Sequence, residues 1–407
     1  MTRRYIPPFF HGLGPVVVPG ILLGVAMMNG QLLVIASPSI RTLLDLEAGP
    51  FGWLLSSWLV SGAVGSLLAG WLADRGYTNP AAIGMVAIMV AGYSLGILEP
   101  SYVCLLTGYA LVGLGISGIA TLGNVAVARA FPTDGTRRAL TWLQLTAAVS
   151  AMMGPVLWAW ILAVIQSAGF SLAGAVRATF AITGILTAFL VLIPIVRPLP
   201  RRPKEVSASS PDDRAGHRPK VTVALVMVLT FVVLHTGADN GMYMWLPDFV
   251  ERHYQPLAFP AAWIISAFSG AYFVGRLALT TLSDRIDDLL LLTIAPAIAA
   301  VLSFFAFQTE SLHALAILYV IAGLSMSVDF PSILSYVGRH FPETAGRIMA
   351  LVGAVSGIAS FVVPPAMGYI GELSGSMRVG MMFPSAMLAA LSVLAFFYRY
   401  RTRASRS

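Results

Sequence analysis

Four ionisable side chains interrupt long apolar segments of this sequence. His235, Asp239, Arg276 and Asp329 each lie within a run of mostly hydrophobic residues. An ionisable group inside a membrane segment costs about 2.5–3.5 kcal/mol of insertion free energy, so such groups usually face a cavity or a partner. The four residues therefore predict a polar site inside an otherwise apolar protein.

His235 and Asp239 are four positions apart, which places them on one face of a helix. We expect Asp239 to carry a proton, the alternative being a position close enough to the surface to be wet. For His235 the alternative is a buried, hydrogen-bonded imidazole without a functional role.

Arg276 can bind an anionic ligand through its planar, bidentate guanidinium group. The alternative is a structural ion pair between Arg276 and Asp329, which we expect at a similar depth, just before Phe330 and Pro331. A buried pair of this kind would suit a gate that opens when one partner is neutralised.

Asp239, Asn240 and Gly241 are poor helix formers, so the helix is predicted to unwind there and offer backbone groups to a ligand. Asn29 and Gly30 occupy the matching place in the first apolar segment. Polar, breakable centres at related positions indicate a binding site between two repeats.

Gln31, Tyr243 and Tyr272 complete the predicted substrate and coupling site. Tyr243 and Tyr272 are candidates for stacking a sugar or an aromatic solute, and Gln31 supplies a neutral hydrogen-bonding group. Trp245 lies near the end of its segment, where anchoring at the membrane interface is the usual role of tryptophan.

The composition is that of a membrane protein. The chain is 57% hydrophobic and 11% charged, with a mean hydropathy of +0.81, whereas soluble domains average about 25% charged residues. The single Cys104 excludes an intramolecular disulfide. We find no metal-ligand spacing, nucleotide-binding loop or catalytic nucleophile motif, and therefore expect no metal, no cofactor and no enzymatic activity. The G-x-G-x-x-G pattern at 113–118 lies in an apolar segment, where small residues serve close helix packing.

Segments of roughly 20 apolar residues are long enough to cross a bilayer core of about 30 Å as helices. On this criterion the sequence predicts an all-α integral membrane protein with twelve transmembrane helices. The expected spans are 15–40, 51–73, 79–98, 102–128, 139–165, 174–196, 221–247, 261–283, 289–308, 312–338, 346–370 and 377–398.

The basic residues indicate the orientation. Of the 25 Lys and Arg residues, Arg276 lies within a span and only four fall in the loops opposite the termini: Arg41, Arg177, Arg252 and Arg378. The other basic residues lie on the side of the termini. Because Lys and Arg accumulate on the cytoplasmic side, both termini are expected there. The net charge of +7 thus indicates topology rather than a nucleic-acid partner.

The two halves of the chain repeat each other at an offset of 210 residues. Gly65 matches Gly275, and the same offset places Asp74-Arg75 on Asp284-Arg285 and Pro155 on Pro365. We therefore predict two pseudo-symmetric six-helix bundles, 1–196 and 221–407. They are joined by a polar linker, 197–220, whose Pro, Ser and charged residues favour a solvated tether.

The segment G-W-L-A-D-R-G at 70–76 resembles the loop motif of the major facilitator superfamily, and Gly154-Pro155 is similar to part of its fifth-helix signature. The segment 239–247 looks faintly like fucose-type sugar:proton symporters, and Arg276 looks like the arginine of monocarboxylate and oxalate carriers. The resemblance implies two halves that rock about a central cavity. It also implies gating roles for Asp74, Arg75, Asp284 and Arg285 at the cytoplasmic ends of helices.

The leading hypothesis is a secondary active transporter of a small polar or anionic organic solute, coupled to protons. It would be a monomer in contact with lipids of a bacterial inner (plasma) membrane. The alternatives are a drug or metabolite exporter, a solute sensor that does not transport, and a lipid flippase.

Overall fold

The computed structural model describes residues 14–98, 101–130, 136–199, 222–254, 258–282, 286–341 and 344–404, in which all regular structure is helical. Twelve helical segments are long and apolar enough to cross a membrane, so the predicted twelve spans are confirmed. The first half holds α1 (Gly14–Ile35), α2 (Ser37–Leu43), α3 (Ala48–Asp74), α4 (Thr78–Ile97), α5 (Tyr102–Ala130), α6 (Thr136–Ser167), α7 (Leu172–Phe189) and α8 (Leu192–Val196). The second holds α9 (Val223–His253), α10 (Ala258–Leu282), α11 (Asp288–Gln308), α12 (Leu312–Met326), α13 (Asp329–His340), α14 (Ala345–Ser374) and α15 (Met377–Ala404).

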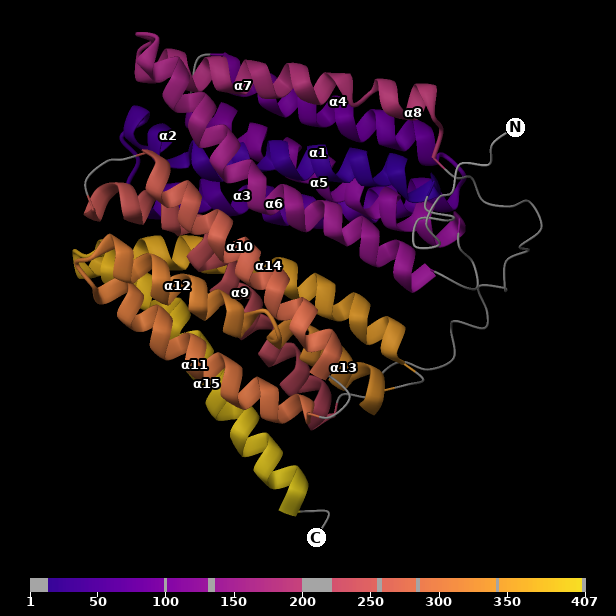
Figure 1. The fold of residues 1–407 in the computed structure, drawn as a ribbon, viewed down its shortest axis with the longest axis vertical. Helices are drawn as coiled ribbons and strands as arrows, with labels where there is room; N and C mark the ends of the chain where they lie inside the picture. The colour runs from indigo at the N-terminus through magenta and orange to yellow at the C-terminus, as the bar shows by residue number, and fades with distance from the viewer. Residues whose placement is uncertain are drawn as a thin grey trace, which may run out of the picture.

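The helices form two bundles that lie side by side, α1–α8 above α9–α15 in Figure 1. The bundles meet at the left of this view and diverge toward the right. We call the left end the closed end. The opposite end, at which α1 begins and α15 ends, is the terminal end. Contact between the halves is made chiefly by α3 with α14 and by α6 with α10.

Small residues bring helices within each bundle close together. A Cβ atom on Gly65 of α3 would collide with the backbone of Leu114 in α5, and one on Gly113 would collide with the backbone of Trp58. The packing role expected for the glycines at 113–118 is therefore confirmed. Side chains that let backbones approach closely are a general feature of helix packing in membranes.

Prolines divide two of the spans. Pro38 lies in the first turn of α2, directly after the break at Ala36. The tenth span breaks at Ser327 and Val328, four and three residues before Pro331, because proline has no N–H for the carbonyl one turn earlier. Asp329 is thus the first residue of α13 rather than a mid-helix residue.

The predicted unwinding at Asp239–Gly241 is wrong, because α9 runs unbroken from Val223 to His253. Asn240 donates its side-chain amide to the Thr236 carbonyl one turn earlier, at 3.1 Å, which ties it to the helix. Gly241 instead permits close packing, since a Cβ there would lie 2.6 Å from Met367 Sδ. The helix around Asn29 and Gly30 in α1 is likewise continuous.

Candidate functional site

A central cavity of about 460 Å³ lies between the two bundles. Five of the predicted site residues from the second half line it, and Gln31 lines it from the first. The lining comprises Gln31, Trp58, Leu59, Gln144, Leu145, Ala148, Ala151, Asp239, Asn240, Tyr243, Met244, Phe268, Ser269, Tyr272, Phe273, Arg276 and Leu277. Its mixture of aromatic surface and a few convergent polar groups is typical of a small-molecule site.

The side chains of Asp239 and Arg276 both contact Tyr272 in this cavity. The hydroxyl of Tyr272 donates to Oδ1 of Asp239 at 3.0 Å. The guanidinium carbon of Arg276, one turn further along α10, lies 5.3 Å from the centre of the Tyr272 ring. The Arg276 side chain makes this cation–π contact, and it forms no ion pair with any of the described residues. The arrangement presents a carboxylate and a guanidinium group side by side to a ligand.

His235 and Asp329 form a second pair, behind the cavity wall. Nδ1 of His235 lies 3.3 Å from Oδ2 of Asp329, and both side chains are almost fully buried. This is an ion-pair distance without hydrogen-bond alignment. Among the described residues, Nδ1 of His235 and both carboxylate oxygens of Asp329 have no hydrogen-bond partner. The alternative structural pair between Arg276 and Asp329 is not formed. It is wrong because Asp329 begins α13, which packs on α9 next to His235.

One hydrogen bond crosses the cavity from bundle to bundle. The hydroxyl of Tyr243 in α9 donates to Oε1 of Gln31 in α1 at 2.7 Å. Gly154 of α6 makes room for Gln31, because a Cβ there would lie 2.7 Å from its Cγ. Gly154, from the fifth-span motif, therefore gives space to a residue of the cavity.

The two predicted asparagines have different surroundings. Asn240 lines the cavity and donates to the hydroxyl of Ser360 at 2.9 Å. Asn29 is fully buried within the first bundle, where it donates to Thr187 Oγ1 at 2.9 Å. Asn29 is therefore not among the lining residues, although it lies two positions from Gln31.

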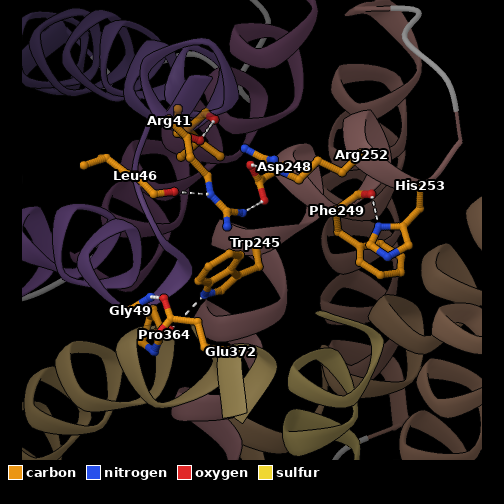
Figure 2. Close-up of polar contacts among 12 residues, drawn as sticks. Arg41, Leu46, Gly49, Trp245, Asp248, Phe249, Arg252, His253, Pro364 and Glu372 are labelled. Atoms are coloured by element: carbon orange, nitrogen blue, oxygen red, sulfur yellow. Dashed lines mark hydrogen bonds and ion pairs between the residues drawn. The ribbon is translucent and has the colours of Figure 1, made fainter. Parts of the chain in front are cut away.

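An ion-pair network joins the two halves at the closed end, as Figure 2 shows. Asp248 of α9 is fully buried and pairs with Arg41 of α2 across the interface. It also accepts from Nε of Arg252, one turn along its own helix, at 3.0 Å. Arg41 additionally donates to the carbonyl of Leu46 at 3.1 Å. A carboxylate buried between two guanidinium groups holds α2 against α9.

Trp245 lies beneath this network and is not the interfacial anchor that its position predicted. It is fully buried, and its indole N–H donates to the carbonyl of Pro364 in α14 at 2.9 Å. Its ring meets that of Phe51 edge-on at 5.1 Å. The prediction is wrong because α9 continues beyond Trp245 to His253 and the other half covers the ring.

The backbones of α3 and α14 are in close contact at the same end. A Cβ on Gly52 would lie 2.5 Å from Cα of Pro365. The amide of Gly49 donates to Oε1 of Glu372 at 2.6 Å (Figure 2). The closed end is therefore sealed by backbone contact as well as by charge.

The predicted gating residues Asp74 and Arg75 lie at the terminal end. The Asp74 side chain is 83% exposed and lies 3.5 Å from Arg129 of the same bundle. The guanidinium group of Arg75 stacks on Trp71 at 3.5 Å, again within one bundle. Asp284 and Arg285 lie outside the described residues, so the structure does not test the gating role of the four.

Sequence reasoning missed the closed-end residues Arg41, Asp248 and Glu372. The available signal was Asp248 itself, an acidic residue directly after Pro247 and one turn before Arg252. Ending the seventh span at 247 placed Asp248 in a loop, where a charge needs no explanation. In the structure it lies within α9, five residues before the last helical residue, His253.

The fold and the cavity define a membrane protein of two six-helix bundles around a central polar site. The model of the major facilitator superfamily matches residues 20–309 and 259–407. The chain belongs to this superfamily, which confirms the resemblance seen in the loop motif.

The chain is similar to the uncharacterized MFS-type transporter YcnB of Bacillus subtilis (strain 168). The two are 25% identical over 147 residues, which are 35% of this chain and 31% of YcnB. Among solved structures, it resembles a bacterial homologue of the human lysosomal transporter Spinster in an inward-facing, unoccupied conformation (TM-score 0.78, 14% identity, 97% of each chain). It also resembles a D-xylose–proton symporter (TM-score 0.71, 14% identity, 94% of this chain and 96% of that one). At such identities the structural likenesses show the fold alone.

Proposed function

We propose that this protein is a secondary active transporter that moves a small organic anion by alternating access, coupled to protons. The observation that carries the proposal is the arrangement of Asp239 and Arg276 around Tyr272 in the central cavity. It is supported by the D-xylose–proton symporter, a protein of the same fold that couples a small solute to protons.

The coupling follows from the charges of the cavity. When Asp239 is ionised, its carboxylate compensates the guanidinium charge of Arg276 nearby. When Asp239 takes up a proton, Arg276 becomes the uncompensated charge and can bind an anion bidentately. Proton and anion therefore favour each other's binding, and the coupling is reciprocal. His235 and Asp329, behind Asp239, offer a second place for a proton within the same helix cluster.

The distribution of basic residues supports a cytoplasmic location for the terminal end. The conformation is then inward-facing, with Arg41, Asp248 and Trp245 sealing the outer side. The similar Spinster homologue in its inward-facing state supports this assignment. Asp74 and Arg75 would pair with the other bundle only when the cytoplasmic end closes.

The test is solute flux in proteoliposomes with and without a pH gradient. We expect at least one of lactate, citrate or benzoate to accumulate only when the gradient is present. Asp239→Asn should abolish this accumulation and leave counterflow exchange, because exchange needs no net proton movement. Asp45→Asn is the matched control, since Asp45 is exposed in a turn with a positive φ of 47° that asparagine also tolerates.

Two outcomes would contradict the proposal. If the Asp239→Asn variant accumulated solute at the wild-type level, Asp239 would have no role in proton coupling. Binding of an anion without flux under any gradient would indicate a solute sensor. Arg276→Lys distinguishes the substrate classes. It should weaken the binding of an anion strongly and the binding of a neutral sugar such as fucose only a little.

A further inference from the structure

An apolar groove runs along the first bundle between α1 and α6, with a volume of about 580 Å³. We call it the α1–α6 wall. It is lined by Val16, Val17, Gly20, Ile21, Gly24, Val25, Met28, Trp142, Leu145, Thr146, Val149 and Ser150. None of these residues carries a charge.

The α1–α6 wall adjoins the central cavity. Leu145 lines both. On α1, the wall residues Ile21, Gly24 and Met28 precede Gln31 at spacings of three, four and three residues, which keep them on one helix face. The face that offers Gln31 to the cavity is therefore the same face that forms the wall. The wall leads from the cavity toward the beginning of α1, at the terminal end.

The hydroxyl groups of the wall do not make it polar. Thr146 donates to the carbonyl of Leu143 at 2.7 Å, and Ser150 donates to the carbonyl of Thr146 at 2.8 Å. Both hydroxyls are thus satisfied by their own helix. Val17 and Ile21 remain 50% and 48% exposed, which is a large apolar area to leave beside a polar site.

The adjoining central cavity carries the charges of Asp239 and Arg276. A ligand anchored on Arg276 by a small anionic group can extend over the wall only if the rest of it is apolar. We propose that the substrate is an amphipathic organic anion, with its acidic group at Arg276 and an apolar body on the α1–α6 wall. This rests on the proposed function and narrows its substrate class.

The test is a homologous series of alkanesulfonates from ethane- to octanesulfonate, which stay ionised and differ only in apolar length. Binding is followed by tryptophan fluorescence in lipid nanodiscs, with empty nanodiscs as the blank, because Trp58 and Trp142 line the two spaces. Burial of each methylene should tighten binding about fourfold. Gluconate, an anion with a hydroxylated body, should bind no better than ethanesulfonate.

Variants locate the effect. Ile21→Asn and Val149→Ser should flatten the dependence on chain length and leave ethanesulfonate binding unchanged. Ile185→Asn is the matched control, because Ile185 is exposed on α7, away from the wall. Arg276→Gln should weaken all members of the series by the same factor, since it removes the anchor and not the wall.

Equal affinity for ethane- and octanesulfonate would overturn the inference, as would the absence of binding by every member. An unchanged chain-length dependence in both Ile21→Asn and Val149→Ser would overturn it too. These outcomes are separate from those for the proposed function, which depends on flux. Length-dependent binding without flux would support the amphipathic binding site and contradict the proposal that the protein is a transporter.

Discussion

The hydroxyl of Tyr243 lies 2.7 Å from Oε1 of Gln31, and this hydrogen bond joins the two bundles within the central cavity. Both residues were predicted from the sequence as members of one site, although 212 positions separate them. A bond between the halves at this depth can exist only while α1 and α9 are close. It therefore depends on the conformation of the closed end.

Tyr243→Phe is expected to open the closed end more often. Loss of one hydrogen bond weakens the closed arrangement by about 1 kcal/mol, which is roughly a fivefold shift in the equilibrium. The measurement is labelling of a Met244→Cys reporter in a Cys104→Ser background. A membrane-impermeant maleimide is added on the closed-end side. Tyr109→Phe is the control, because the Tyr109 hydroxyl donates to Leu33 within one bundle. Equal labelling of both variants would contradict the prediction.

Asp248→Asn is expected to weaken the closed end more than Arg41→Gln does. The first change leaves two guanidinium groups facing each other, whereas the second leaves Asp248 paired with Arg252. Breaking a buried ion pair typically costs about 3–5 kcal/mol. The same labelling assay measures the effect, and the double variant should differ from the sum of the single ones because the residues are in contact.

The control for these charge changes is Arg177→Gln. Arg177 is exposed on α7, so labelling should stay at the wild-type level. Strict additivity of Arg41→Gln and Asp248→Asn would show that the pair does not couple the halves.

Gly52→Ala is expected to push α3 and α14 apart. Its new Cβ would lie 2.5 Å from Cα of Pro365, and a backbone atom cannot move aside as a flexible side chain can. Labelling of the reporter should therefore increase, and accumulation of substrate should fall. Gly70→Ala on the same helix is the matched control, because its Cβ would meet nothing nearer than Thr121 at 4.0 Å. Similar behaviour of the two variants would rule out a role for the close approach.

The charge of Asp287 is expected to stabilise the second bundle, and this stabilisation is expected to be lost at acidic pH. Partial burial acts to raise the pKa of Asp287, but hydrogen bonds from Arg399 and the Leu289 amide, with the charge of Arg403, outweigh it and leave the pKa below the ordinary 3.8. A carboxyl group with a lowered pKa in the folded state contributes stability above its unfolded pKa. That contribution is lost as the pH falls through the folded pKa.

Asp287→Asn keeps a residue that can cap α11 and removes only the charge. The thermal unfolding midpoint of the wild type should exceed that of the variant at pH 5. The difference should shrink toward about pH 3 as Asp287 is protonated. A difference that stays constant over this range would show that the ion pairs with Arg399 and Arg403 do not stabilise the protein.

The sequence was sufficient for the twelve spans and the superfamily, because apolar length and the loop motif are local signals. Long-range partners are not local. Asp329 pairs with His235 instead of Arg276, since the break at Ser327 turns Asp329 toward α9. Asp248 and Arg41, 207 positions apart, carry no pattern that links them. The functional roles at Asp239 and Arg276 stay predictions.

Asn240 and Gly241 illustrate a further limit. Their low helix propensity suggested a break. Helix α14, however, supplies Ser360 as a hydrogen-bond partner for Asn240 and Met367 as a packing partner for Gly241, and α9 continues. In a bilayer core an unwound backbone must find replacement hydrogen bonds, so continuity is favoured wherever packing allows it.

The sealed closed end also has an electrical consequence. A water-filled cavity that opens at the terminal end takes the potential of the compartment on that side. Most of the membrane voltage then falls across the thin layer holding Asp248, Arg41 and Trp245. A unit charge that crosses this layer changes energy by about 2.3 kcal/mol per 100 mV. The field is thus concentrated on the network that holds the closed end together.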